Sequence, residues 1–292
     1  MTILRTIEDL SGLLEIGLKE LCLLIGNADN SYVSFRIPKR SGKKRIIDAP
    51  QPLLKNIQRC LLDRLLYQKM PHQAVHGFVP GKSIVSNARC HTGRQWVATL
   101  DIQDFFPSTT SGHVRQVLAQ IPSIAPPVVE SICRLVTRND RLPQGAPTSP
   151  HLANLAFYDA DRALTRLAGE YRLVYTRYAD DLAFSGNEKP DGLPEDVGAI
   201  VLAHGYRLAE DKTKITGRHR RQLVTGLVVN DGVRLPRELR RKLRAIMNEI
   251  RTTADFGIFP GSLCGTEEEL QGYLSLLAMV EQTETKGNSQ IF

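Results

Sequence analysis

Two adjacent carboxylates, Asp180 and Asp181, interrupt an apolar stretch of this sequence. Residues 173–178 before them and residues 182–185 after them are rich in aromatic and β-branched side chains, which suit strands. The pattern predicts a strand, a tight turn that carries the carboxylates, and a second strand. Because Asp-Asp pairs also occur in solvated turns, the pair alone does not define a site.

A third carboxylate, Asp101, lies near the end of another predicted strand, residues 96–102. Alternation gives this strand two faces, one with Trp96, Ala98, Leu100 and Ile102, and the other with Val97, Thr99 and Asp101. One face is expected to join the core while the other carries the carboxylate. Burying several carboxylates together is costly unless cations neutralise them, so packing these strands side by side predicts raised pKa values or bound metal. Oxygen-only ligands favour Mg²⁺ or Mn²⁺.

The composition is that of a soluble globular protein, with 292 residues, 42% hydrophobic and 24% charged. This length allows one large domain or two or three subdomains. No apolar run approaches the length of a membrane span, and the first residues lack the apolar core of a signal peptide, so we expect a cytoplasmic protein with no membrane contact. The cysteines are scattered and odd in number, which predicts reduced thiols: Cys22, Cys60, Cys90, Cys133 and Cys264.

The formal net charge of +7 is concentrated towards the C-terminal end. Between residues 205 and 251, 13 Lys and Arg residues stand against 5 Asp and Glu residues. A predicted helix there has an apolar stripe formed by Leu239, Leu243, Ile246, Met247 and Ile250. Another face carries Arg237, Arg240, Arg241, Arg244 and Arg251. The clustering indicates a polyanionic partner, most commonly nucleic acid, with a merely solvated basic face as the alternative.

Periodicity and turn residues predict the remaining elements. Helices are expected over residues 3–25 (one or two), 53–70, 114–118, 127–136, 152–168 and 267–280. Residues 32–38 and 46–50 predict the strands of a hairpin with a basic turn at 39–45. Residues 78–83 and 141–150 are expected to be loops.

Three motifs occur in the order found in reverse transcriptases. Residues 100–106 (Leu-Asp-Ile-Gln-Asp-Phe-Phe) resemble the first catalytic motif of that family, residues 142–150 its nucleotide-binding loop, and residues 178–181 (Tyr-Ala-Asp-Asp) its second catalytic motif. Residues 87–91 (Asn-Ala-Arg-Cys-His) and 224–226 (Val-Thr-Gly) resemble the N-A-x-x-H and V-T-G signatures of bacterial retron reverse transcriptases. The resemblance covers residues 39–226 and identifies the chain as similar to the retron enzymes.

The resemblance implies a two-metal polymerase site. Asp101, Asp180 and Asp181 would hold two Mg²⁺ ions, or Mn²⁺, one activating a primer hydroxyl and the other holding the nucleotide triphosphate. The backbone at Ile102 would also contact the metal-bound triphosphate. Phe106 matches the steric gate whose ring excludes a ribose 2′-hydroxyl. Its neighbour Phe105 is a nucleotide-site candidate for which a core position is the stronger alternative.

Other nucleotide contacts are implied by the loops. Gln144 and Gly145 match positions that pack against the incoming nucleotide, where glycine permits close backbone approach. Lys44 or Arg45 would neutralise the triphosphate, and Arg45 is preferred because it opens the following strand.

Lys212 matches a lysine of motif D and is a candidate general acid for pyrophosphate. A solvated surface lysine is the alternative reading of this residue. The sequence departs from the retron pattern here, because Ala209 stands where these enzymes often have Asn.

RNA contacts are implied for two further motifs and the basic helix. Asn87 and His91, four residues apart, would share a helix face, and one would orient the other or contact RNA. A buried histidine with satisfied ring nitrogens is the alternative. Val224, Thr225 and Gly226 resemble a region that recognises the cognate RNA, although as plain sequence they form an ordinary strand with a glycine. The basic helix would contribute Arg237, Arg240, Arg241 and Arg244 to the phosphate backbone.

The fold implied is α/β (α+β), a right-hand polymerase with an antiparallel palm sheet backed by helices. Fingers would comprise residues 1–94 and 112–149, the palm residues 95–111 and 150–232, and the small helical thumb residues 233–292. The retron resemblance implies priming from an internal 2′-hydroxyl of a cognate structured noncoding RNA that also serves as template. The product would be a branched RNA-linked single-stranded DNA (msDNA), made in antiphage defence.

The resemblance also implies partners. Besides dNTPs and the RNA–DNA hybrid, an effector protein encoded nearby is expected. We expect no ribonuclease H domain in the chain, so a host ribonuclease H would act on the product. Two alternatives remain: a group II intron-like, diversity-generating or abortive-infection reverse transcriptase, and a non-catalytic RNA-binding scaffold or antitoxin-like partner. The retron signatures argue against the first, and the complete set of carboxylates argues against the second.

Overall fold

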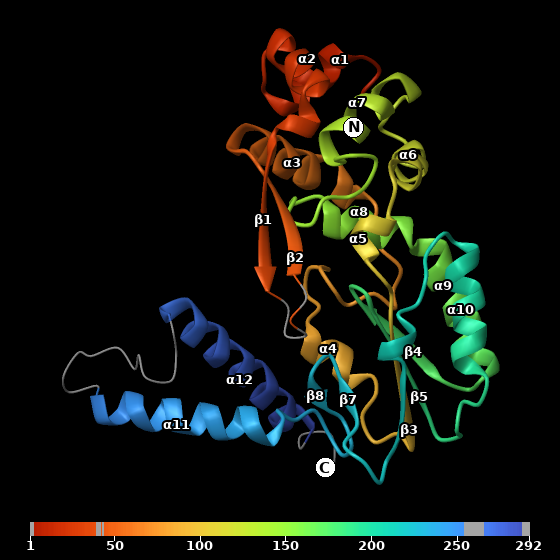
Figure 1. Ribbon diagram of the computed structural model, residues 1–292, viewed down its shortest axis with the longest axis vertical. Helices are drawn as coiled ribbons and strands as arrows, with labels where there is room; N and C mark the ends of the chain where they lie inside the picture. The colour runs from red at the N-terminus through yellow and green to blue at the C-terminus, as the bar shows by residue number, and fades with distance from the viewer. Residues whose placement is uncertain (1–2, 39–41, 43, 254–265, 288–292) are drawn as a thin grey trace.

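The largest sheet of the computed structural model, called the central sheet below, has four antiparallel strands and lies at the lower right of Figure 1. The structure describes residues 3–38, 42, 44–253 and 266–287. The strand order is β4-β5-β3-β6. The strands are β3 (Trp96–Asp101), β4 (Val174–Tyr178), β5 (Asp181–Gly186) and β6 (Lys214–Gly217). The first three confirm the strands predicted around the carboxylates, whereas β6 was not predicted.

Helices cover one face of this sheet. Those next to it are α9 (Tyr158–Glu170) and α10 (Leu193–Ala203), which lie together beside the sheet in Figure 1. Leu164 and Val197 from these helices are fully buried in one apolar cluster with Leu100 and Phe184 of the sheet. Removing this apolar surface from water is the main force that holds the helices on the sheet.

The opposite face of the sheet is also packed, which the sequence pattern did not predict. Val97 and Ala183 are buried in a second cluster, which also contains Val85, Leu243 and Val280. The elements of this cluster are α4 (Ile84–Arg89), β7 (Leu223–Val224), β8 (Leu227–Val228), α11 (Arg237–Thr253) and α12 (Glu267–Gly287). Asp101, at the end of β3, lies beyond these two clusters and is partly exposed.

The N-terminal part forms a helical layer with a projecting hairpin (Figure 1). Its helices are α1 (Ile7–Leu14), α2 (Leu18–Gly26), α3 (Pro52–Arg64), α6 (Ser111–Ala119) and α7 (Pro126–Val136). The predicted hairpin is β1 (Tyr32–Pro38) with β2 (Lys44–Pro50), paired in register from Tyr32 opposite Pro50 to Pro38 opposite Lys44. Residues 39–41 and 43 of its basic turn lie outside the described residues.

Two predicted helices are wrong in their extent. The helix expected over 53–70 ends at Arg64, and a 3₁₀ turn, η2 (Leu66–Gln68), follows because Leu65 leaves the helical conformation (φ −127°, ψ −55°). The helix expected over 152–168 is two helices, α8 (Ser149–Ala156) and α9, which meet at Phe157. The Phe157 ring is fully buried at this junction, where it packs edge-on against Phe105.

The short elements are η1 (Ala28–Asn30), α5 (Phe105–Ser108) and η3 (Glu210–Lys212). The four cysteines in the described part of the chain are free thiols, as expected, and Cys264 lies outside it. None of the described helices combines the length and the apolar character that a membrane span needs.

Candidate active site

A cleft of about 1940 Å³ opens at the carboxylate end of the central sheet. This volume exceeds the roughly 300–1,000 Å³ of typical small-molecule pockets, so the cleft has room for more than a single nucleotide-sized ligand. Most of the predicted catalytic and nucleotide-binding residues line it: Arg45, Asp101, Ile102, Phe105, Phe106, Gln144, Gly145, Asp180 and Lys212. The sequence motifs, separated by up to 167 positions between Arg45 and Lys212, therefore meet on one surface.

The three carboxylates come together through strand register. Asp101, the last residue of β3, pairs directly opposite Asp181, the first residue of β5. Asp180 lies in the turn between β4 and β5, and its carbonyl oxygen accepts a hydrogen bond from Ile102 N at 2.9 Å. The turn is closed by Ala179, whose φ of 56° is left-handed. Asp180 thus lies beside both neighbouring carboxylates.

Proximity and partial burial disfavour the ionised carboxylates. Burial and the nearby Asp101 raise the pKa of Asp180. Burial, followed by repulsion from Asp180 and Asp101, raises the pKa of Asp181 to about 6, although part of the Asp181 surface is open to solvent. Like charges held this close favour a bound cation.

Positive side chains offset part of this repulsion. Lys212 Nζ lies 2.6 Å from Asp101 Oδ1, and its charge together with that of Arg45 limits the rise in the pKa of Asp180. Within the described ranges, no three His, Cys, Asp or Glu side chains are grouped tightly enough to hold an ion as they stand. The donor set nevertheless fits Mg²⁺ in its chemistry, because it consists of carboxylate oxygens whose mutual repulsion a divalent cation would relieve.

The Gln144 loop is fastened to the β1–β2 hairpin. Asp48 N donates a hydrogen bond to Gln144 O at 2.7 Å, and Asp48 also pairs with Arg138 at 2.5 Å. Gly145 has a φ of 127°, and a Cβ there would lie 3.0 Å from Asp48 O. Glycine is thus required both by its conformation and by its closeness to β2.

The two phenylalanines after Asp101 occupy different environments. Asp104 adopts a left-handed conformation (φ 46°) and starts the short helix α5, which turns the chain away from β3. Phe105 is buried, packing on Phe157 and Tyr206, whereas Phe106 is half-buried in the cleft wall. Phe105 thus occupies the core position weighed as its alternative, and Phe106 presents a ring to the cleft.

Two of the predicted catalytic and nucleotide-binding residues do not line the cleft. Lys44 is exposed on β2 and does not line the cleft, whereas Arg45 does. Asp181 reaches the site through its cross-strand pairing with Asp101 and does not line the cleft either. Of the two candidates Lys44 and Arg45, Arg45 is thus the one whose side chain faces the cleft.

Asn87 and His91 are fully buried away from the cleft. The prediction that they share a helix face is wrong, because α4 ends at Arg89 and His91 N closes a tighter turn on Ala88 O at 3.0 Å. His91 Nδ1 lies 2.7 Å from Ser185 Oγ, and His91 Nε2 lies 2.7 Å from Thr176 Oγ1. Burial lowers the pKa of His91 to about 3, so the ring is neutral. This is the satisfied, buried histidine weighed as the alternative to an RNA contact.

Val224, Thr225 and Gly226 form a hairpin corner instead of an ordinary strand. Val224 ends β7, while Thr225 (φ 46°) and Gly226 (φ 79°) make the turn to β8. Two consecutive left-handed residues are typical of the tight turns that match strand twist. Thr225 Oγ1 donates to Ile84 O at 3.0 Å, which ties the corner to the start of α4.

The basic helix has the predicted amphipathic character. Leu243 and Ile246 on α11 are buried, while the four predicted nucleic-acid contacts are exposed: Arg237, Arg240, Arg241 and Arg244. The side chains of Ile250 and Arg251, also assigned to these faces, lie outside the described residues. Figure 1 shows α11 and α12 extending to one side of the central sheet.

Residues 37–229 match the sequence profile of the family described as reverse transcriptase (RNA-dependent DNA polymerase). The retron Ec86 reverse transcriptase of Escherichia coli is 30% identical over 298 residues, covering 100% of this chain and 88% of its own length. The chain belongs to the retron reverse transcriptase family.

Other relatives agree with this assignment. The retron Mx65 reverse transcriptase of Myxococcus xanthus is 40% identical over 247 residues, covering 77% of this chain and 57% of its own length. The chain likewise covers 58% of the retron Mx162 reverse transcriptase of the same organism, so it spans little more than half of these two relatives. The solved structure of apo telomerase from Candida tropicalis aligns over 70% of this chain and 47% of that protein, with a TM-score of 0.50 and 12% identity, which shows likeness in fold alone.

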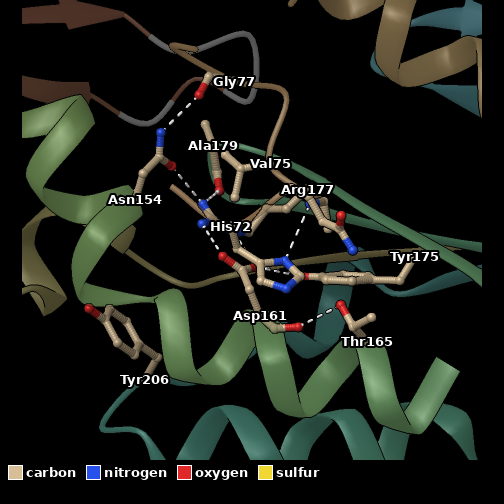
Figure 2. A network of polar contacts seen from close by, with 12 residues as sticks. His72, Val75, Gly77, Asn154, Asp161, Thr165, Tyr175, Arg177, Ala179 and Tyr206 are labelled. Carbon is tan, nitrogen blue, oxygen red and sulfur yellow. Dashed lines mark hydrogen bonds and ion pairs between the residues drawn. The ribbon is translucent and has the colours of Figure 1, made fainter. Parts of the chain in front are cut away.

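A buried ion pair behind the Asp180 turn was missed by the sequence analysis (Figure 2). Arg177 and Asp161 are both fully buried and joined by two hydrogen bonds, from Arg177 Nε at 2.8 Å and from Nη2 at 2.6 Å. Arg177 Nη1 donates to Asn154 Oδ1 at 2.9 Å and to Ala179 O at 3.0 Å. The guanidinium therefore holds the carbonyl of the left-handed residue that precedes Asp180.

The same network also holds the segment that contains Val75 and Gly77. Asn154 Nδ2 donates to Gly77 O at 2.9 Å, and Gly77 packs so closely that a Cβ there would lie 2.5 Å from Ala179 N (Figure 2). Val75 forms an isolated parallel β-bridge with Arg177. An arginine one residue before Tyr178, in a strand that periodicity marks as buried, is the sequence signal that could have suggested a buried partner.

Proposed function

We propose that this retron reverse transcriptase is an RNA-directed DNA polymerase that copies a cognate structured noncoding RNA into RNA-linked single-stranded DNA. The observation that carries the proposal is the direct cross-strand pairing of Asp101 with Asp181 beside Asp180, in a cleft shared with Arg45, Gln144 and Phe106. A family-typical carboxylate set on a packed sheet is the arrangement that a nucleotidyl-transfer site needs.

In this proposal Asp101, Asp180 and Asp181 would hold two Mg²⁺ ions, or Mn²⁺, with the Ile102 backbone beside these carboxylates. When bound, the ions supply the positive charge that activates a primer hydroxyl and stabilises the leaving pyrophosphate. The raised pKa of Asp181, about 6, supports this fit, because burial and then repulsion from Asp180 and Asp101 disfavour the ionised carboxylate, and a bound cation would offset both.

The chain's own side chains bind and orient the nucleotide. Arg45 neutralises the triphosphate from the hairpin, while Gln144 and Gly145 form the wall against which the nucleotide packs. The ring of Phe106 occupies the space that a ribose 2′-hydroxyl would need, which selects dNTPs. Lys212, charged and next to Asp101, is placed to donate a proton to the pyrophosphate.

The right-hand subdomains are assigned on this basis. Fingers comprise residues 1–94 and 112–149, the palm comprises residues 95–111 and 150–232, and the thumb comprises residues 233–292. The central sheet with α9 and α10 supports the palm assignment, and the exposed arginines of α11 support contact between thumb and nucleic acid. The Val224–Gly226 corner, tied to α4, would contact the noncoding RNA through its exposed edge, with Asn87 and His91 supporting α4 from within.

The retron relatives support the more specific parts of the proposal. The noncoding RNA serves as template and primer, priming starts at an internal 2′-hydroxyl, and msDNA is the product. An effector protein encoded nearby and host ribonuclease H complete the system, which acts in antiphage defence.

The test is synthesis of RNA-linked DNA by the chain purified with the noncoding RNA from its own locus. With dNTPs and Mg²⁺ we expect a labelled product that shortens on ribonuclease treatment in a denaturing gel. DNA without an RNA link would support a different kind of bacterial reverse transcriptase. Absence of any DNA would favour a non-catalytic RNA-binding scaffold.

A further inference from the structure

Phe78 is an aromatic residue of the cleft wall that the polymerase motifs leave without a role. The residue is 48% exposed and belongs to the loop that follows the Gly77 contact. Its ring centroid lies 6.3 Å from that of Phe106 and 6.4 Å from that of Tyr178. Both separations fall within the range at which aromatic rings attract one another.

The backbone of Phe78 is held in an unfavourable conformation. Its φ of 58° is left-handed, which is rare for a bulky residue and persists only where the surroundings impose it. The constraints are visible on the preceding residue: Asn154 Nδ2 binds Gly77 O, and Gly77 fits against Ala179 without room for a side chain. Because Arg177 binds both Asn154 and Ala179 O, one buried network fixes the Asp180 turn and the Phe78 loop together (Figure 2).

Phe106 is in ring contact with two aromatic neighbours of different character. Phe105, at a centroid distance of 5.7 Å, is buried and lies under the Arg177 guanidinium, whose Cζ is 5.3 Å from the ring. Phe78 is the exposed neighbour. Its position is fixed through the preceding residue, Gly77, which belongs to the buried network. The ring that faces the nucleotide is thus supported from both the palm core and the loop.

We propose that Phe78 is a positioning residue for sugar selection: its ring keeps Phe106 from moving aside for a ribose 2′-hydroxyl. The inference rests on the proposed function, because it needs Phe106 to face the nucleotide sugar. Steric exclusion requires that the excluding ring be unable to move, so a residue that limits its movement sets the selectivity without touching the nucleotide. Loss of Phe78 would leave Phe106 present but free to rotate.

The test compares kcat/KM for a dNTP and the matching rNTP in the RNA-bound full chain carrying Phe78→Ala, Phe106→Ala, or both. We expect Phe78→Ala to lower the dNTP preference at least about tenfold, as expected when a residue that excludes a substrate is loosened. The double variant should be no less selective than Phe106→Ala alone, because Phe78 acts through Phe106. Phe78→Tyr should retain the preference. Leu23→Ala, a change at a 66% exposed apolar residue on α2, is the matched control and should behave like wild type.

An unchanged dNTP preference in Phe78→Ala would overturn the inference. So would additive losses in the double variant, which would mean that Phe78 contacts the nucleotide or nucleic acid directly. Phe78→Leu, which retains apolar bulk without an aromatic ring, serves if Phe78→Ala is unstable by thermal melting, and it should also lower the preference. A wild-type chain that incorporates no dNTP would instead contradict the proposed polymerase activity.

Discussion

Lys212 Nζ lies 2.6 Å from Asp101 Oδ1, joining the 3₁₀ turn η3 to the end of β3. The Lys212 side chain is 56% exposed, whereas that of Asp101 is only 14% exposed. The hydrogen bond to Asp101 raises the pKa of Lys212, so this side chain is positively charged at neutral pH. A cation is thereby held against the carboxylate to which we assign a metal.

Replacing Lys212 with Met should separate two effects of this charge. Turnover should fall about 10²-fold, the usual contribution of a general acid, while the affinity for Mg²⁺ should rise because the carboxylates lose a competing cation. Single-turnover kinetics and isothermal titration with Mg²⁺ measure the two quantities. Lys214→Met, at an exposed lysine two residues along the chain, is the control. Unchanged turnover in Lys212→Met would remove Lys212 from the chemistry.

Asp181→Asn should stabilise the metal-free protein in a pH-dependent way. The pKa of Asp181 is raised from 3.8 to about 6 in the folded state, so the folded protein binds this proton more tightly than the unfolded chain. The free energy of unfolding therefore falls as pH rises from about 4 to about 6, and the penalty is complete above that range. In EDTA, Asp181→Asn should raise Tm by roughly 2 °C or more at pH 7.5 and leave it unchanged near pH 4.

Thermal melting across this pH range, with Glu170→Gln as the control at an exposed carboxylate, measures the effect. Added Mg²⁺ should raise the wild-type Tm and have little effect on the Asn variant, because a cation that binds only the folded site stabilises it. A pH-independent difference would contradict this electrostatic account.

Arg177→Met should be strongly destabilising, because it leaves the Asp161 carboxylate buried without its partner. The expected loss is about 3–5 kcal/mol in the free energy of unfolding. Adding Asp161→Asn removes the stranded charge and retains an acceptor for Tyr175 Oη, so the double variant should recover most of this stability. The double variant should nevertheless polymerise slowly, because Ala179 O has lost the hydrogen bond from Arg177.

Urea unfolding and the rate of DNA synthesis, measured on both variants, separate these two consequences. Full recovery of the synthesis rate in the double variant would show that Arg177 contributes stability alone and does not position the Asp180 turn.

The combined change of Arg240, Arg241 and Arg244 to Gln should weaken RNA binding in a salt-dependent manner. Each lost phosphate contact reduces the slope of log affinity against log salt by about 0.7–0.9, so the slope should fall by about 2 to 3. Fluorescence anisotropy at several salt concentrations measures it. The control removes the same charge elsewhere, through exposed residues Lys55, Arg59 and Arg166 changed to Gln. Equal slopes in both triple variants would show that the effect is one of net charge alone.

Local patterns were sufficient for the strands that carry the carboxylates. Alternation predicted the strand of Asp101, and aromatic and β-branched residues predicted the two strands that flank Asp180 and Asp181. Packing these strands side by side then brought the three carboxylates together. Gln144 and Phe106 were found through motif resemblance, and the buried packing of Phe105 on Phe157 agrees with the core position that the sequence favoured for it.

Features that depend on long-range contacts could not be read in this way. The pairing of Arg177 with Asp161 joins a strand to a helix, and neither residue's own neighbours indicate the other. The break at Phe157 follows from tertiary packing, since the apolar periodicity continues through it. Phe78 and Thr225 have left-handed backbone conformations although neither is a glycine, so their residue types did not indicate these conformations.

The most direct test of the central claim is single-nucleotide incorporation on a defined RNA template with a DNA primer, comparing wild type with Asp180→Asn and Asp181→Asn. We expect wild type to extend the primer with dNTP and Mg²⁺, to stop on addition of EDTA, and to resume when Mg²⁺ is returned in excess. Each Asn variant should keep its RNA affinity and lose extension by about 10³-fold or more. Extension by either variant at the wild-type rate, or wild-type extension that persists in EDTA, would contradict a metal-dependent site built on Asp101, Asp180 and Asp181.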